Sequence, residues 1–326
     1  MKMDLETKGG KSSAIRRIKH PRGQTKLKSP VGFKSIVVPI DFSETSIRAL
    51  DYAIALAGEF GSQIHLIHVL EFPAVLNCTS QHSYAMLDKE AKRSATARLS
   101  KLVTEKVDEW ITANDEVRFG RAYKIICETA EKQKADLIVI GTHGFTGLRH
   151  LFLGSTAERV IRHAPCSVLV VRKQTGRNAK PFFKPKKILV PTDFSKLSAQ
   201  AHQSAVALAR QYQSQLHLLY VVPADYDLMD YARHAAEEKK AGQKKLGEMS
   251  KKLTTKKISV KTEIRNGRPA TEITDACREL GSDLIAISTH GRTGWDHVFL
   301  GSTTEEVVRH SLCPVLVVRK NENPAR

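Results

Sequence analysis

The chain has 326 residues, of which 41% are apolar, a length and composition typical of two globular domains and unlike those of a disordered protein. No apolar run approaches the roughly 18 residues that a membrane span requires, and the N-terminus lacks the apolar core of a signal peptide. The net charge of +18 suggests a nucleic-acid-binding protein, but +8 lies in residues 1–34 and +7 in residues 172–187, which leaves +3 elsewhere and excludes a uniformly basic body.

The first 32 residues are predicted to form a basic, disordered tail. A solvated arm is the simplest interpretation of such a charge run. Two alternatives stay open: a salt-sensitive, non-specific attraction to nucleic acid or acidic partners, and a transit peptide, since the segment is poor in acidic residues.

Residues 33–172 form the first predicted domain, in which strands and helices alternate. Its first strand, residues 34–40, ends at Asp41, and Ser43 is placed to cap the helix that follows. The other predicted elements are, in order, a helix at 45–60, a strand at 63–70, a helix at 84–113, a strand at 116–120, a helix at 123–134, a strand at 137–140, a helix at 155–163 and a strand at 167–171. Several strands are almost entirely apolar, which indicates a parallel sheet covered by helices on both faces.

Residues 186–320 repeat this pattern and form the second predicted domain. Asp193 ends the first strand of this half at an offset of 152 residues from Asp41, and from Gly120 and Gly267 onward the offset is 147. The difference of five residues falls between the second strand and the long helix, where a loop tolerates length changes. The two halves are therefore divergent copies of one domain.

Residues 173–185 are predicted to be a basic, extended linker, because they contain two prolines and show no hydrophobic periodicity. Residues 321–326 are predicted to be a C-terminal tail. The predicted fold class is α/β, with two tandem open five-stranded parallel sheets of strand order 3-2-1-4-5, a Rossmann-like arrangement with helices on both faces and right-handed crossovers.

A glycine-rich segment occurs twice, as GTHGFTGLRHLFLGS at 141–155 and as STHGRTGWDHVFLGS at 288–302. Each copy follows an apolar strand and precedes a helix, an arrangement in which backbone N–H groups converge on an anion. In a sheet of order 3-2-1-4-5 the first and fourth strands are neighbours, so each copy is expected beside Asp41 or Asp193. A carboxylate accepts hydrogen bonds from the hydroxyls of a ribose, and the main chain of glycine residues can approach phosphates closely. Each half is therefore predicted to bind a nucleotide.

The pattern G-x2-G-x9-G-(S/T), together with V-P-x-D-F-S at 38–43 and 190–195, resembles the universal stress protein family, and the resemblance extends over residues 33–172 and 186–319. It implies the same five-stranded, adenine nucleotide alpha hydrolase-like fold and the binding of ATP, or of ADP or AMP. Any Mg²⁺ is expected to come with the phosphates, since no carboxylate cluster is evident for it. In the first domain the resemblance implies the binding residues Pro39, Ile40, Asp41, Val69, Gly141, Gly144, Gly154, Ser155 and Thr156. In the second domain it implies Pro191, Thr192, Asp193, Val221, Ser288, Gly291, Gly301, Ser302 and Thr303.

The second copy departs from this pattern in two places. Ser288 replaces the first glycine, and serine does not readily adopt positive φ angles, so the main chain is predicted to approach a ligand less closely there. Asp296 replaces Arg149, which puts a carboxylate near the phosphates, although Arg292 offsets it. Two plainer interpretations stay open: the strand-end aspartates can serve only as helix caps, and the glycine segments only as structural turns.

No catalytic or metal-binding residue is predicted. The glycine segments lack the lysine of a G-x4-G-K-(S/T) loop, and the chain has neither a G-x-S-x-G nucleophile turn nor the His/Cys spacing of a zinc site. The predicted function is an ATP-binding regulatory module of the stress response, with at most very slow hydrolysis. The alternative is a stress scaffold that binds no nucleotide and acts through dimerisation and its basic tail.

The resemblance also implies pairing through the last strand of each domain. Residues 167–171 and 315–318 are predicted to join within one chain as a pseudo-dimer, which a linker of 13 residues permits because it spans roughly 40 Å. A homodimer of two chains stays open. The five cysteines form no CxxC pair, and this usage favours a reducing cytoplasm.

Overall fold

The computed structural model describes residues 32–71, 81–142, 153–172, 183–224, 231–289 and 300–319. The predicted N-terminal tail, most of the predicted linker and the predicted C-terminal tail lie outside these residues. The first half contains β1 (Ser35–Pro39), α1 (Glu44–Phe60), β2 (Gln63–Leu70), α2 (Gln81–Lys106), β3 (Ala113–Phe119), α3 (Ala122–Lys132), β4 (Leu137–Gly141), α4 (Ser155–His163) and β5 (Ser167–Val171). The second half contains β6 (Lys187–Pro191), α5 (Lys196–Tyr212), β7 (Gln215–Pro223), α6 (Tyr231–Thr254), β8 (Val260–Gly267), α7 (Pro269–Leu280), β9 (Leu284–Ser288), α8 (Ser302–His310) and β10 (Val315–Val318).

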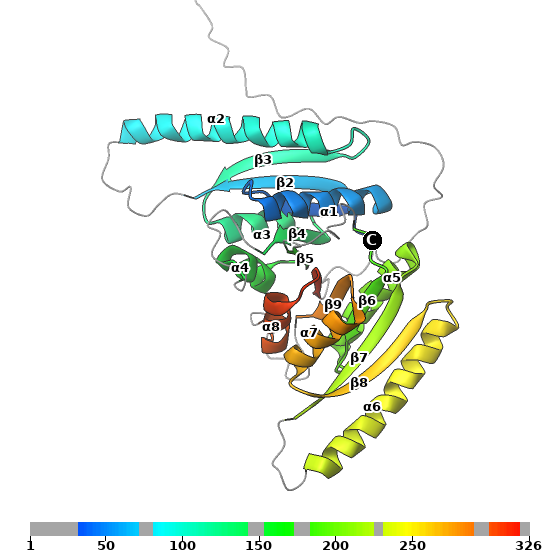
Figure 1. Ribbon diagram of the computed structural model, residues 1–326. Coiled ribbons are helices and arrows are strands. Elements are labelled where there is room, and N and C mark those ends of the chain that lie inside the picture. Colours follow the sequence, from blue (N-terminus) through cyan, green and yellow to red (C-terminus); the bar gives the residue numbers. More distant parts are fainter. Residues whose placement is uncertain are drawn as a thin grey trace, which may run out of the picture.

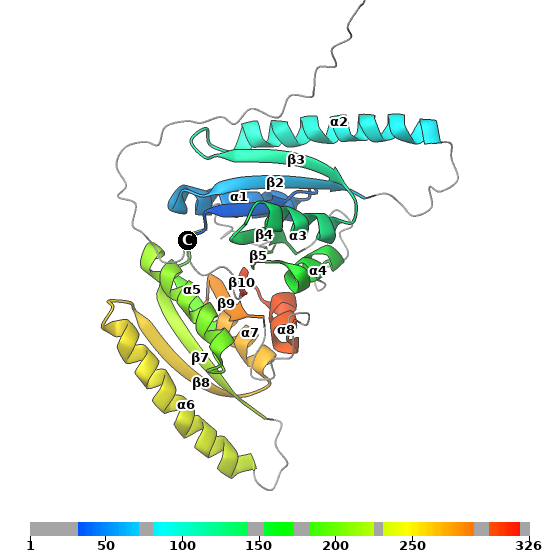
Figure 2. The same ribbon diagram turned by 180° about the vertical axis from the view of Figure 1, so that it is seen from behind.

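The strands of the described residues form one sheet in the order β3-β2-β1-β4-β5-β10-β9-β6-β7-β8. Within each half the neighbouring strands are parallel and follow the predicted order 3-2-1-4-5. The halves meet where β5 and β10 pair antiparallel, with Leu316 opposite Leu169. Figures 1 and 2 show the first half above the second, with β5 and β10 between them.

Helices cover both faces of the sheet, and the side chains of adjacent residues in a strand point to opposite faces. In β1, Ile36 and Val38 belong to the core beneath α1, α2, α5 and α6. Val37, between them, belongs to the core beneath α3, α4, α7 and α8, with Ile126 and Ile161. All of these side chains are buried. Because a strand covered on both faces needs apolar residues at every position, β1 is an almost continuous apolar run.

The boundary between α2 and β3 differs from the prediction. The helix ends at Lys106 and the strand begins at Ala113, whereas the sequence predicts a helix to residue 113 and a strand from residue 116. Val107 and Ile111 are buried in a turn, in which the Ile111 N–H donates to the Asp108 carbonyl at 2.9 Å. Their spacing of four is helical in the sequence, so periodicity alone does not distinguish this buried turn from the last turn of a helix.

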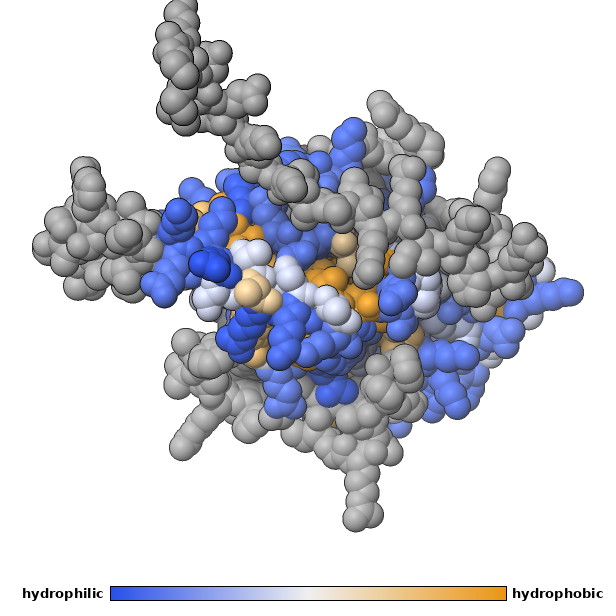
Figure 3. Space-filling model, turned by 90° about the horizontal axis from the view of Figure 1, so that it is seen from above, coloured by the Kyte–Doolittle hydropathy of each residue, from blue (hydrophilic) through white to orange (hydrophobic). Residues whose placement is uncertain are grey.

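Helix α2 contacts the sheet through a narrow stripe that includes Ala95 and Leu99, which are buried, whereas the residues on either side of each are exposed. From above, on the side of α2, the described surface is mostly hydrophilic, and apolar side chains are visible mainly near its centre (Figure 3). No helix among the described residues combines the length and the apolar character that a membrane crossing needs.

Residues 183–185, which the sequence analysis assigns to the linker, pack in the folded body. The Phe183 side chain is only 6% exposed. Its ring centroid lies 5.4 Å from that of Tyr52 on α1 and 5.8 Å from that of Tyr212 on α5. Close by, the Ser214 hydroxyl donates to the Pro185 carbonyl at 2.6 Å. Phe183 therefore joins a helix of the first half to a helix of the second.

Two arginines reinforce the antiparallel junction of β5 and β10. Arg172, directly after β5, donates to the carbonyl of Arg309 near the end of α8. Arg319, directly after β10, donates to the carbonyl of Ile161 at 3.1 Å and to that of Arg162, both near the end of α4. Each half thus supplies donors to the last carbonyls of a helix in the other half, groups that have no partner within their own helix.

Candidate functional site

A cavity of about 330 Å³ opens at the carboxyl ends of β1, β2 and β4. The starts of α3 and α4 form its other walls, so it occupies the crevice that the strand order predicts. Of the residues predicted for this half, Gly144 lies outside the described residues and all the others line the cavity. These others are Pro39, Ile40, Asp41, Val69, Gly141, Gly154, Ser155 and Thr156.

The second half has a cavity of about 490 Å³ at the equivalent place, at the ends of β6, β7 and β9 and the starts of α7 and α8. Gly291 lies outside the described residues, and the other residues predicted for this half line the cavity. They are Pro191, Thr192, Asp193, Val221, Ser288, Gly301, Ser302 and Thr303.

Asp41 lines the first cavity and also orders the start of α1. Its Oδ1 accepts hydrogen bonds from the Ser43 backbone N–H at 3.0 Å and from the Ser43 hydroxyl at 2.6 Å. The Ser43 Oγ accepts in turn from the Ser46 N–H at 3.2 Å, which makes Ser43 the N-cap of α1, as predicted. Phe42 has a φ of 63°, so the chain turns sharply between the aspartate and the cap. The aspartate itself is not the N-cap, but its carboxylate orients the Ser43 side chain that caps the helix.

Asp193 occupies the equivalent position in the second half. Its Oδ1 accepts from the Ser195 N–H at 3.0 Å, the Ser195 Oγ accepts from the Ser198 N–H at 3.1 Å, and Phe194 has a φ of 62°. Burial opposes ionisation of Asp193, but hydrogen bonds from the hydroxyl and backbone of Ser195 outweigh it and lower the pKa of this carboxyl. Asp193 is therefore ionised at neutral pH and is a strong acceptor for hydroxyl groups.

Helices α4 and α8 begin at the cavities with glycine N-caps. Gly154, the N-cap of α4, donates its N–H to the Thr142 carbonyl at 2.7 Å. Gly301, the N-cap of α8, donates to the Thr289 carbonyl at 2.9 Å. A glycine offers no side-chain acceptor to the first-turn N–H groups, and the positive end of the helix dipole lies there. Both cavities therefore have a wall that attracts anions.

Of the two predicted reasons for a weaker second site, the conformational one is wrong, and the other, Asp296 in place of Arg149, lies outside the described residues. Gly141 and Ser288 are the last residues of β4 and β9, and neither has a positive φ angle, so serine is conformationally acceptable at this position. Gly141 is needed for another reason: a Cβ there would lie 2.9 Å from the backbone carbonyl carbon of Thr45, at the start of α1. The missing side chain lets α1 pack directly on the end of β4.

One wall of the first cavity, between the end of β2 and the start of α3, contains residues that were not predicted. Glu71, Ala122 and Ile126 line it. The Glu71 Oε1 accepts from the Ala122 N–H at 2.5 Å. These residues belong to no glycine motif. The available signal was positional, because Glu71 follows a strand whose carboxyl end lies next to the crevice.

The same wall is different in the second half, where it contains Pro223, Arg268 and Pro269. Arg268 Nη2 lies 2.7 Å from Glu306 Oε1 on α8, and this ion pair connects the starts of α7 and α8 beside the cavity. The two cavities thus share their aspartate and helix N-terminus but differ in the wall between the second strand and the helix after the third.

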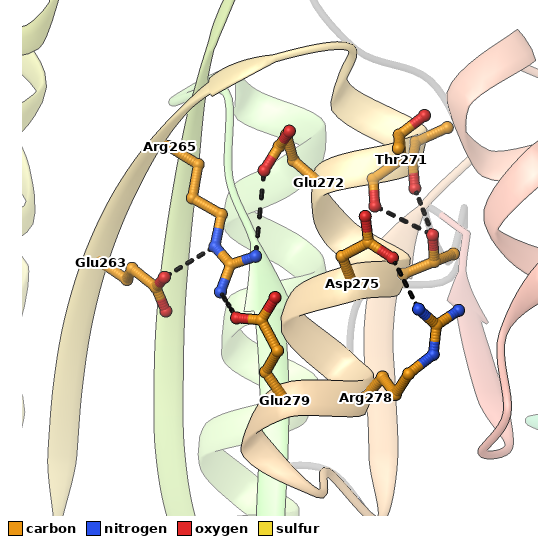
Figure 4. A network of polar contacts seen from close by, with 9 residues as sticks. Glu263, Arg265, Thr271, Glu272, Asp275, Arg278 and Glu279 are labelled. Carbon is orange, nitrogen blue, oxygen red and sulfur yellow. Dashed lines mark hydrogen bonds and ion pairs between the residues drawn. The ribbon is translucent and has the colours of Figure 1, made fainter.

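A cluster of charges holds β8 against α7, whose first turns line the second cavity (Figure 4). Arg265 on β8 contacts Glu263 and Glu279 at 2.6 Å each and Glu272 at 3.8 Å. Only 15% of the Arg265 side chain is exposed. Burial opposes its charge, but hydrogen bonds to Glu279 and Glu263 outweigh it and raise the pKa of Arg265.

Replacing Arg265 with methionine is expected to lower the free energy of unfolding by about 1–2 kcal/mol, because three carboxylates then face one another without a cation. Since a raised pKa keeps the guanidinium charged until the solution is strongly alkaline, the loss should be the same at pH 6 and pH 9. Urea unfolding at both pH values measures it. Arg278→Met is the control: Arg278 pairs with Asp275 but is 62% exposed, so its loss should stay within about 0.5 kcal/mol. Equal losses for the two variants would contradict the prediction.

Comparison with known proteins agrees with this architecture. The model of the universal stress protein family matches residues 32–172 and again residues 184–319. The chain belongs to the universal stress protein family. A universal stress protein of Methanocaldococcus jannaschii, MJ0531, is 39% identical over 142 residues, which cover 43% of this chain and 83% of that protein. The aligned length of 142 residues is close to that of one of the two matches to the family model in this chain.

Solved structures of family members also resemble the chain. A universal stress protein from Archaeoglobus fulgidus DSM 4304 matches with a TM-score of 0.65 at 22% identity, covering 89% of this chain and 98% of that one, which shows the fold. A universal stress protein solved in complex with cAMP matches 44% of this chain and 98% of its own, at 25% identity and a TM-score of 0.30.

Proposed function

We propose that each half binds an adenine nucleotide in its cavity, and that the chain is a nucleotide-dependent regulatory module of the stress response. The observation that carries the proposal is the repeated lining: an aspartate, a helix N-terminus with a glycine cap and an apolar wall surround one cavity in each half. These groups match the sugar, the phosphates and the base of a nucleotide. Any Mg²⁺ would be held through the phosphates.

The first cavity supports binding rather than turnover. Among the described residues that line it, the carboxylates of Asp41 and Glu71 each accept from a backbone N–H group, that of Ser43 and that of Ala122. Carboxylates committed to the start of a helix are fixed in orientation, which suits recognition of a ligand. Rapid phosphoryl transfer needs a positioned nucleophile and an added cation on the phosphates. We therefore propose at most very slow hydrolysis.

Native mass spectrometry of the purified full chain tests the proposal. Up to two adenine nucleotides per chain should co-purify or bind on addition of ATP, ADP or AMP, one for each cavity. Absence of binding at millimolar nucleotide, measured in the same way and by calorimetry, would leave only the scaffold function.

Asp41→Asn is expected to weaken ATP binding at the first site about tenfold, because the amide oxygen keeps the hydrogen bonds to Ser43 but loses the charge that strengthens a bond to a sugar hydroxyl. Asp193→Asn should do the same at the second site. Isothermal titration on each variant measures the affected site against the unchanged one. Asp115→Asn is the control, since Asp115 is bonded to Ser100 and does not line the cavity. Wild-type affinity at both sites of Asp41→Asn would refute a role of this aspartate in binding.

We also propose that the two halves act as one pseudo-dimer. The antiparallel pairing of β5 with β10 and the arginines that cross it support this arrangement, because they give each half the same contacts to the other. Both cavities would then belong to one continuous sheet. A reducing cytoplasm suits the buried, unbridged thiols of Cys166 and Cys313.

A further inference from the structure

We propose that Glu71 selects the base of the nucleotide bound in the first half, and that it favours a base with an exocyclic amino group, such as adenine. The inference rests on the proposed function, because it concerns the ligand class of the same cavity. It adds a specificity-determining residue that lies outside the motifs shared by the two halves.

The base is expected at the wall that carries Glu71. The N-terminus of α4, at Ser155, favours the phosphates because of its N–H groups and dipole. Asp41, at the end of β1, suits the sugar hydroxyls. The wall that remains is largely apolar and includes Val69 and Ile126, which suits the flat face of a base. Glu71 is the charged group on that wall among the described residues that line the cavity.

Glu71 is held in a defined orientation. Its Oε1 accepts from the N–H of Ala122, the first residue of α3, at 2.5 Å. Arg121, the N-cap of α3, makes no side-chain hydrogen bond to the helix, and Glu71, directly after β2, supplies an acceptor to its first N–H group. One carboxylate oxygen is therefore used for the helix, and the group retains acceptor capacity on the other. A fixed carboxylate accepts a hydrogen bond from an amino group and repels a carbonyl oxygen.

The second half lacks both parts of this arrangement. Pro223 stands at the position of Glu71, at the offset of 152, and Pro269 stands at the position of Ala122, at the offset of 147. Both prolines line the second cavity. The carboxylate and the N–H that holds it are thus replaced together, because proline has neither an acidic side chain nor a backbone N–H. The second site should distinguish amino from carbonyl bases less strongly than the first.

Titration of the full chain with ATP and with inosine triphosphate tests the proposal, because the two ligands differ at position 6 of the purine, amino in one and carbonyl in the other. One wild-type site should prefer ATP by roughly tenfold or more. In Glu71→Gln the amide carbonyl can still accept from Ala122, but its NH₂ group now favours a carbonyl base. The preference for ATP at that site should therefore fall roughly tenfold, with the second site unchanged.

Glu128→Gln is the matched control. It makes the same chemical change on α3, at a residue that pairs with Arg118 and does not line the cavity, so the preference should stay at the wild-type value. If Glu71→Gln keeps the wild-type preference for ATP over inosine triphosphate, Glu71 only stabilises the start of α3, and the inference is overturned. If that variant fails to fold, equal affinity of the wild type for both ligands at both sites overturns it instead. Failure of the wild type to bind either ligand removes the proposed function as well, so the two failures are distinguishable.

Discussion

Phe183→Ala is expected to lower the free energy of unfolding by about 3–5 kcal/mol and to loosen the contact between the halves. Its ring is buried between Tyr52 of α1 and Tyr212 of α5, so its removal leaves a cavity that neither helix can fill without moving toward the other. Urea unfolding measures the loss of stability. Hydrogen exchange should show faster exchange in α1 and α5 than in the wild type.

Phe183→Leu and Leu312→Ala are the controls for this prediction. Leucine keeps most of the apolar volume and should cost about half as much as alanine. Leu312 is a large apolar residue that is 61% exposed, so its truncation should change stability by less than about 0.5 kcal/mol. A Phe183→Ala protein that unfolds at the wild-type urea concentration would mean that the aromatic contact does not hold the halves together.

The contribution of Phe183 shows what the sequence could not predict about the fold. The strand order was predictable, because the repeat, the apolar runs and the alternation of strands with helices all point to the same parallel sheet. The burial of Phe183 was not, since it lies in a segment rich in basic residues and prolines, KPFFKPKK at 180–187, and its ring contacts come from helices that are far away along the chain. The predicted end of α2 was wrong for the same reason. Trp110, beyond that end, packs against Gly58 of α1, a contact that no local sequence pattern encodes.

The residues of the candidate site were also predictable only in part. The aspartates and the glycine N-caps, Gly154 and Gly301, were predictable because they recur in both halves, and they line the two cavities. Glu71 and Glu306 were not predicted, because Pro223 and Arg159 stand at the equivalent positions and a repeat draws attention only to what is shared. Arg268 was not predicted either, although Arg121 is its equivalent, because it belongs to no glycine motif. Their relation to the cavity depends on how the end of β2 meets the start of α3, which is a matter of tertiary packing. Differences between copies therefore mark the residues that can give each site its own ligand preference.

Gly141→Ser is expected to lower the free energy of unfolding by about 2–3 kcal/mol, near the upper limit of the usual cost of an overcrowded core. It is also expected to weaken nucleotide binding at the first site. The new Cβ would lie 2.9 Å from the Thr45 backbone carbon and 3.0 Å from its carbonyl oxygen, and backbone atoms cannot rotate away as a side chain does. The start of α1 must therefore move, and Asp41, which is tied to that start through Ser43, must move with it. Urea unfolding and ATP titration measure the two effects.

The reverse exchange in the other half supplies the matched control. Ser288→Gly should cost only about 0.5–1 kcal/mol, the usual penalty for glycine in a strand, because β9 already accommodates the larger residue. It should also leave binding at the second site close to the wild-type value, since neither Ser288 nor Gly141 has a positive φ angle that only glycine would relieve. If the two exchanges cost the same, the close approach of α1 to β4 is not what requires glycine at 141. If Ser288→Gly instead strengthens ATP binding severalfold, the serine side chain itself obstructs the second site, and the difference between the halves lies in ligand access and not in helix packing.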